Sequence, residues 1–341
     1  MIFDKNSKGS AELKELIGFI YKSINFSNLK SYIGFAVRDI KKVIGQEVFI
    51  TAENHYKSDN YLLAEPDTDH PEYGILDELV SKIQYPVAVH AYRKYVPSSD
   101  LTHSDKGRQI FVSEQEKPAF EWQIEKDNEN LLALAHEATD VLLEFLDANI
   151  DAVFSGTGNL VIPWRTSDAF KATRKLLIPD VSEFEKVFMI GSSRLTFISL
   201  VPFIRRVQEN EIQPSIGQSR YTGLLTELLA DDLCDENIPV LDKIRPPLAL
   251  LALSVAVKRL SAEILPSGIF SNIVSNVVKG RNVASKQDRS EISSSLEKDG
   301  MRELIKLQEY CRKIDLVNTG EVFTTIDADQ RIDPLQKFVR L

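Results

Sequence analysis

The two halves of this 341-residue chain carry the same order of apolar residues, and this repetition constrains the fold more than any other feature. The matching stretches are 12–36 with 183–207, then, after a shift of one residue, Ile40, Ile44 and Gly45 with Ile212, Ile216 and Gly217, and later KIQYPVA at 82–88 with KIRPPLA at 243–249. The apolar positions agree while the polar ones differ, as expected when two copies fill similar cores but have separate surfaces. The sequence therefore predicts a tandem duplication of one domain.

The size and composition of the chain fit two soluble domains of roughly 150 residues each. With 43% apolar and 27% charged residues, the chain has the composition of a folded globular protein. Its net charge of −9 argues against a general coat for nucleic acid, which needs a basic face to displace counterions.

The cysteines and the apolar runs exclude several further classes. Cys234 and Cys311 are far apart in sequence, which favours reduced thiols in a cytosolic protein over a disulfide framework or a zinc site. The N-terminus lacks the apolar core of a signal peptide. The longest apolar run, residues 246–257, is too short to cross a bilayer, so no membrane role is expected.

Each half is predicted to be a mainly α-helical bundle with a short β-strand or hairpin insertion. The expected helices are 10–23 and 181–190, then a pair capped by Asn28 or Ser199 and ending at Gly45 or Gly217, then 75–95 and 240–264, and last 130–147 and 291–314. The two glycines are expected to adopt the left-handed conformation that follows many helices. Polar loops are expected at 54–72 and 230–237, and strands at 109–113 and 271–278. Pro86 and Pro247 are expected to kink or interrupt the third helix of each half.

These elements define four segments of the chain. We expect helical domains at residues 1–150 and 181–316, a linker at 151–180 and a C-terminal tail at 317–341. The linker is predicted to contain a hairpin at 153–163 and a helix capped by Ser167.

The histidines offer three candidate sites, and a structural explanation is favoured at each. Asp67, Asp69 and His70 share a polar loop without the glycine and glutamate of a calcium loop. His136 and Asp140 are spaced to share a helix face, but a surface polar pair is favoured over a metal site. His90 matches Leu251 of the other half, which favours a core histidine. No catalytic residue, cofactor or metal ligand is therefore assigned.

Two further clusters are candidates for binding. One is a basic spot that could contact a phosphate or a nucleic-acid backbone, although a solvated loop is favoured, and it consists of Lys279, Arg281, Lys286 and Arg289. The other is an apolar group at the chain end, formed by Leu335, Phe338, Val339 and Leu341. Chain ends are normally polar and frayed, so these residues pack back on their own domain or dock into a neighbouring subunit, and they are the candidate subunit contacts.

Two sequence patterns resemble a known family. One runs from Leu29 to Gly45 and is repeated from Leu200 to Gly217; the other is LPSGIFS at 265–271 followed by ASKQDR at 284–289. Both resemble an uncharacterised family of structural-module proteins of Bacteroidetes phages and prophages, including relatives of the crAss-like phages. The first half departs from the second pattern, with THSD at 102–105. The resemblance implies a virion protein, specifically a head-to-tail connector or neck ring component.

The expected protein is therefore a non-enzymatic structural subunit. The resemblance implies a homo-oligomeric ring in the virion, assembled in the cytoplasm of the bacterial host and contacting the portal and other neck and tail proteins. DNA would pass nearby without sequence-specific binding. Two alternatives stay open: an enzyme with a site between the repeats that uses His90, Asp69 or His136, and a nucleic-acid-binding protein that uses the basic spot at 279–289.

Overall fold

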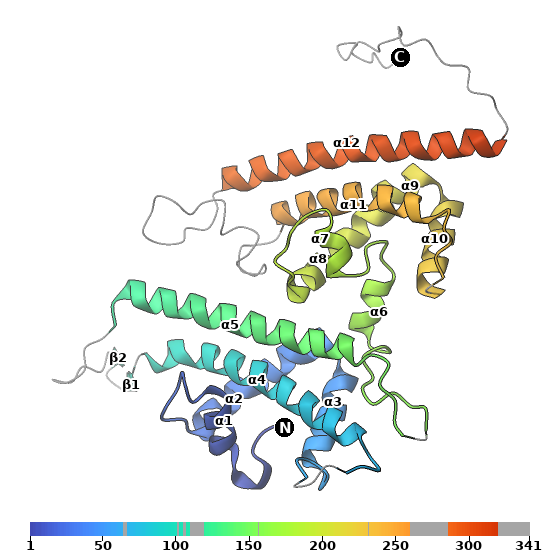
Figure 1. The fold of residues 1–341 in the computed structure, drawn as a ribbon. Helices are drawn as coiled ribbons and strands as arrows, with labels where there is room; N and C mark the ends of the chain where they lie inside the picture. Colours follow the sequence, from blue (N-terminus) through green and yellow to red (C-terminus); the bar gives the residue numbers. More distant parts are fainter. Residues whose placement is uncertain are drawn as a thin grey trace.

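The computed structural model describes residues 1–63, 67–100, 102–104, 107–109, 119–155, 157–230, 232–259 and 286–319. Within them the chain is mainly α-helical, and the helices of the two halves are stacked in layers (Figure 1). No helix of the described part is both long and apolar enough to cross a bilayer.

The first half contains five helices in its described residues. After a short 3-10 turn at Lys5–Ser7 come α1 (Gly9–Ile17), α2 (Phe26–Ile44), α3 (Gln46–Lys57), α4 (Glu72–Ser99) and α5 (Glu121–Ala148). A single core holds them together, and it extends from Ile2 to Trp164. Residues 161–164 of the predicted linker therefore belong to the first core, because Val161, Ile162 and Trp164 are buried in it.

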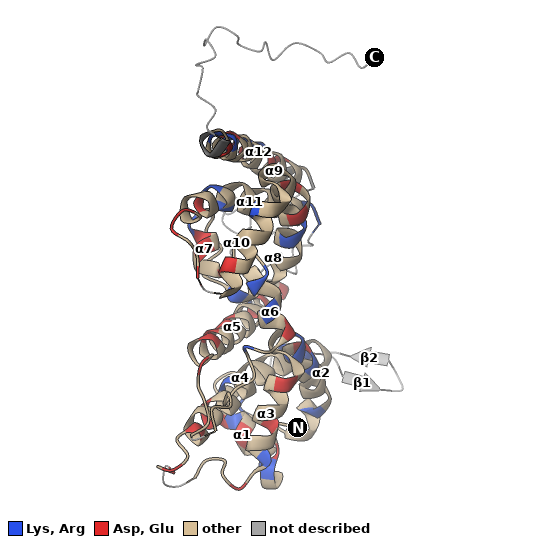
Figure 2. Ribbon diagram, turned by 90° about the vertical axis from the view of Figure 1, so that its right-hand side faces the viewer, with Lys and Arg blue, Asp and Glu red and all other residues tan. Residues whose placement is uncertain are grey.

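The second half repeats the same order of helices. The short α6 (Asp168–Arg174) connects the halves, and it is followed by α7 (Val181–Glu185), α8 (Arg194–Val207), a π-helical turn (Gln208–Ile212), α9 (Gln213–Ile216), α10 (Gln218–Ala230), α11 (Ile238–Arg259) and α12 (Lys286–Thr319). A separate core extends from Leu176 to Cys311. Seen from the side, α5 and α6 lie between the two halves and α12 lies at the outer end (Figure 2).

Several helix boundaries differ from the prediction. Asn25 and Ser193, not Asn28 and Ser199, cap α2 and α8, and their side chains accept hydrogen bonds from the backbone of Ser27 and Thr196. Each helix starts earlier because it includes a phenylalanine of the core. The predicted cap at Ser167 is confirmed, since its side chain accepts from the backbone nitrogen of Phe170 at 3.2 Å.

Gly45 and Gly217 occupy the same special position in the two halves. Their φ angles are 87° and 84° and their ψ angles 154° and 147°, a combination that essentially only glycine adopts. The positive φ was predicted, but the backbone turns directly into a further helix, α3 or α10. The first polar loop of the prediction is shorter for this reason: α3 extends to Lys57, and it buries Phe49 and Tyr56.

The prolines lie within continuous helices, and one short hairpin follows α4. Helix α4 continues through Pro86 and α11 through Pro247, so the expected interruption does not occur, and the kink that was the other expectation stays a prediction. A short antiparallel hairpin, β1 (Thr102–Ser104) and β2 (Gly107–Gln109), follows α4. It shares only Gln109 with the predicted strand; residues 110–113 and all of 271–278 lie outside the described residues, so the predicted insertions stay predictions.

Candidate functional site

The best-defined polar site outside the cores is the junction between the halves, where α5 meets the N-terminus of α8. The Asp140 Oδ1 atom accepts a hydrogen bond from the backbone nitrogen of Leu195 at 2.7 Å. Seven residues further along α5, Asp147 forms an ion pair with Arg194 and accepts a hydrogen bond from Trp164 Nε1 at 2.7 Å. Because the first backbone N–H groups of a helix lack partners within the helix, carboxylates are favourable there. The junction is therefore a specific contact between the last helix of one repeat and the next repeat.

A cleft of about 340 Å³ lies beside this junction. Residues of both halves line it, among them Asp147, Trp164, Phe170 and Arg194. Asp147 and Arg194 neutralise each other, and neither His90 nor His136 is among the described residues that line the cleft. An enzyme that uses His90, Asp69 or His136 between the repeats thus has no support from this cleft.

The His136–Asp140 pair is divided between two structural roles. Asp140 binds α8, whereas burial and the nearby Arg93 guanidinium lower the pKa of His136. A neighbouring positive charge and a carboxylate already in use do not favour a bound cation. In the described part of the chain, no group of three or more potential metal ligands occurs.

His90 lies in the seam between α4 and α5. Its Nε2 atom is 3.2 Å from Thr139 Oγ1, and the Thr139 hydroxyl donates to the Ala135 carbonyl oxygen at 2.8 Å. His90 Nε2 must therefore be the donor in the first of these bonds. Burial, together with the charge of Arg93, lowers the pKa of His90 to about 4. The His90 ring is therefore neutral and hydrogen-bonded, as expected for a histidine in a protein core.

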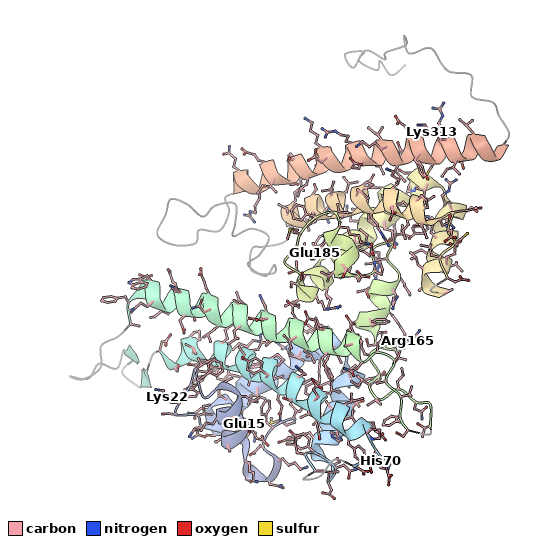
Figure 3. The ribbon with its side chains drawn as sticks, viewed as in Figure 1. Glu15, Lys22, His70, Arg165, Glu185 and Lys313 are labelled. Atoms are coloured by element: carbon pink, nitrogen blue, oxygen red, sulfur yellow. The ribbon has the colours of Figure 1, made fainter. Side chains whose placement is uncertain are left out.

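The loop containing Asp67 and His70 is held by its own hydrogen bonds. The Asp67 Oδ1 atom accepts from the backbone nitrogens of Asp69 and His70 at 2.9 and 3.2 Å. His70 Nδ1 is 3.0 Å from Glu72 Oε1, and this carboxylate raises the pKa of the exposed His70 ring. Figure 3 shows His70 at the end of the first half that is remote from the second. The polar groups that made this loop a candidate stabilise its turn.

A polar clamp that sequence reasoning missed joins α3 to the start of α4. His55 Nε2 is 2.8 Å from Asp77 Oδ1, and the same oxygen accepts from the backbone nitrogen of Leu62 at 3.1 Å. The second half has an equivalent clamp, in which Glu227 accepts from Asn237 Nδ2 at 2.7 and 2.9 Å and from the backbone nitrogen of Cys234. Both clamps join the end of one helix to the start of the next, and they do so with different residue types. The contact between His55 and Asp77 is therefore explained by its structural role. Only knowledge of α3 could have paired these positions.

The remaining candidates lie mostly beyond the described residues. Lys279, Arg281 and the tail residues Leu335, Phe338, Val339 and Leu341 lie outside them, and of Lys286 only the backbone, at the start of α12, is described. Arg289 is half-buried on α12, and its Nε atom has no hydrogen-bond partner among the described residues. The basic spot and the subunit contacts therefore stay predictions.

Comparison with known proteins gives one match. The model of a family of unknown function, DUF6712, matches residues 40–158 and 212–315. The two matches begin at Ile40 and Ile212, which are corresponding positions of the repeat, and this agrees with a duplicated domain. No curated protein and no solved structure matches the chain.

Proposed function

The chain belongs to DUF6712, and we propose that it is a non-enzymatic structural subunit that assembles head-to-tail into a ring, as a connector in the neck of a tailed phage. The observation that carries the proposal is an exposed face of α12 that corresponds to the face of α5 at the internal junction. One repeat binds the next through this face inside the chain. The same face of the last repeat can bind the first repeat of another copy.

The correspondence between α5 and α12 follows from their packing. His90 and Leu251 are corresponding positions of α4 and α11, 161 residues apart. Thr139 contacts His90, and a Cβ atom on Gly300 would lie 2.8 Å from Leu251 Cγ, so Thr139 and Gly300 also correspond. The spacing between them is again 161 residues.

This spacing identifies the residues of α12 that correspond to the junction residues of α5. Asp140 corresponds to Met301, and Asp147 corresponds to Gln308. Met301 and Ile305 are one turn apart on the same side of α12, and they are 47% and 57% exposed. On the outer side of α12, Figure 1 shows no other described element. An apolar pair thus takes the place of the carboxylate that binds α8.

The surface that would receive α12 is the start of the first repeat. The N-terminus of α2 corresponds to the N-terminus of α8, and Phe19, in the turn before α2, is 69% exposed. A contact between α12 of one copy and this region of the next is heterologous, because two different surfaces meet. Repetition of such a contact generates a closed ring or an open filament.

The phage setting of the proposal rests on the resemblance to phage structural modules. A neck ring would contact the portal and other neck and tail proteins within the virion. The net charge of −9 suits a channel through which DNA passes without binding strongly. A portal or capsid gene beside this gene would support the setting, and its absence from every genomic neighbourhood of the family would oppose it.

Mixing two variants tests the heterologous contact. Met301→Asp with Ile305→Asp removes the α12 surface, and Phe19→Asp removes the receiving surface. We expect the unmodified chain to form high-order oligomers in native mass spectrometry, with or without the portal protein, and each variant alone to be monomeric. An equimolar mixture of the two variants should form a heterodimer, since each retains the surface that the other lacks.

The control replaces two exposed apolar residues elsewhere. Met189 and Leu229 are 79% and 56% exposed, and Met189→Asp with Leu229→Asp should leave oligomerisation unchanged. Far-UV circular dichroism checks that each variant is folded. Oligomers that survive the α12 substitutions, or an unmodified chain that is monomeric even with the portal protein, would contradict the proposal.

A further inference from the structure

We infer that the C-terminal segment of this chain, residues 320–341, docks in a groove of its own second half, beside Gly217. The groove lies between α9, the start of α10 and the end of α12, and it has a volume of about 460 Å³. Its lining includes Ile216, Gly217, Arg220, Gln308, Cys311 and Leu316. The inference comes from the first half, where the chain that leaves the last helix fills the corresponding place.

In the first half, the chain after α5 turns back and closes the domain. An antiparallel bridge joins Val153 and Leu160, and the residues that follow it are buried in the first core. Trp164 Nε1 donates to Asp147 on α5 at 2.7 Å. Ser167 approaches the end of α2, with its Cβ 3.3 Å from where a Cβ of Gly45 would lie. The segment thus touches both α5 and the glycine that follows α2.

Both of these contact positions have counterparts in the groove. Gly45 corresponds to Gly217, and Asp147 corresponds to Gln308. The two residues belong to different helices, and the correspondence of each was established without reference to the groove. Around Gly217, a Cβ atom would meet nothing within 4 Å in the described structure. The second half therefore has the receiving surface, and the segment that follows its last helix is the one the repeat assigns to it.

The C-terminal segment has the length and the composition to reach the groove. When the two helices are aligned by the repeat spacing, α12 extends ten residues further than α5, which ends at Ala148. These ten residues add about 15 Å of helix. An extended chain covers roughly 3.3 Å per residue, so about five residues return over this distance. The remaining residues include the apolar group Leu335, Phe338, Val339 and Leu341. In the first half, the buried residues Val161, Ile162 and Trp164 have this role.

A thiol at position 312 reports on the groove, because Arg312 lines the groove and is exposed in the described structure, whereas Cys311 is already buried by the second core. The experiment uses Arg312→Cys with Cys234→Ser and Cys311→Ala in the Met301→Asp and Ile305→Asp background, so its result does not depend on the proposed ring. The rate of maleimide labelling at position 312 is measured in the full chain and in a chain ending at Thr319. We expect labelling to be at least tenfold faster in the shortened chain, and protection in the full chain to be unchanged on dilution.

A second variant guards against misfolding of the shortened chain. Phe338→Asp with Leu341→Asp keeps the full length and should also expose the thiol at position 312, whereas Lys337→Ser with Arg340→Ser, which changes polar residues of the same segment, should not. Equal labelling rates in all four chains would overturn the inference. Protection that is lost on dilution would overturn it as well, because the segment would then dock into a neighbouring copy.

Discussion

The last two long helices pack together in both halves, but the seam between them differs in chemistry. Between α4 and α5 lie His90, Arg93, His136 and Thr139, and burial keeps the histidines neutral. Between α11 and α12, small residues take these places: Ser293 Oγ donates to the Ser254 carbonyl oxygen at 2.9 Å, and Gly300 packs against Leu251. The comparison teaches that the duplicated fold requires a periodic apolar face and a close fit, and that different side chains can supply them.

The largest effect is expected from giving the second seam a side chain of the first. In Gly300→Thr, the new Cβ would lie 2.8 Å from Leu251 Cγ and 3.2 Å from the Leu251 backbone nitrogen, so the helices must separate. Overpacking of this kind lowers the free energy of unfolding by about 3 kcal/mol. The second half should unfold at lower urea concentration by circular dichroism.

Tryptophan fluorescence provides the internal reference for this variant. Both tryptophans, Trp122 and Trp164, precede the second core, and Trp164 is buried in the first. The fluorescence midpoint should therefore stay unchanged, and Asp299→Thr, which alters an exposed neighbour on α12, should affect neither signal. A Gly300→Thr chain as stable as the unmodified one would show that the second seam is not closely fitted.

The second effect concerns acid sensitivity, which the first half should have through His90. The pKa of His90 is about 4 when folded and about 6.5 when unfolded, so the unfolded state binds the proton first as the pH falls. Stability is full above pH 6.5 and is lost toward pH 4, by about 2 kcal/mol between pH 7 and pH 5. His90→Leu, which introduces the residue of the second half, should reduce this loss as measured by Trp164 fluorescence during thermal unfolding.

The exposed histidine serves as the control for this measurement. The pKa of His70 is raised by Glu72, so its contribution has the opposite sign and weakens as the pH rises. His70→Gln should therefore leave the acid-induced loss in place. An unchanged acid sensitivity in His90→Leu would mean that another group, such as His136, is responsible.

The smallest effect separates the two corresponding glycines. Alanine at Gly45 or Gly217 would be strained by the positive φ, at a cost of about 1–2 kcal/mol in either half. Gly45→Ala also presses against Ser167, whereas Gly217→Ala meets no described atom. We expect Gly45→Ala to lower the free energy of unfolding by up to about 1 kcal/mol more than Gly217→Ala. Urea unfolding of both variants checks the difference, and equal losses would show that Ser167 yields without strain.

Much of the fold followed from the periodicity, and the misses have identifiable causes. The apolar periods located α2, α4 and α5, and a cap and two glycines were placed correctly by local backbone chemistry. Helix α3 was missed although its buried residues follow a helical period, because two of them, His55 and Tyr56, stand in a stretch that reads as a polar loop. Helix α4 continues through Pro86 because the ring is buried in a packed helix, where tertiary contacts outweigh one missing hydrogen bond.

The junction could not have been derived in the same way. Asp140 and Asp147 read as polar residues on the exposed side of a helix, and their partners, Leu195 and Arg194, are more than forty residues away. Nothing in the local pattern distinguishes a carboxylate in water from one that caps a distant helix. The candidate pair His136 and Asp140 was misleading for this reason.

The sequence by itself determined that one helical domain occurs twice, because the spacing of apolar residues is a property of each helix and its core-facing side. The tertiary structure alone decided which polar residues meet. It showed that α5 binds α8 of the second half, that α12 presents the corresponding face outward, and that a groove lies beside Gly217. The physical reason is that a polar side chain is compatible with water or with a partner, and only the folded arrangement of the helices determines which of the two it meets.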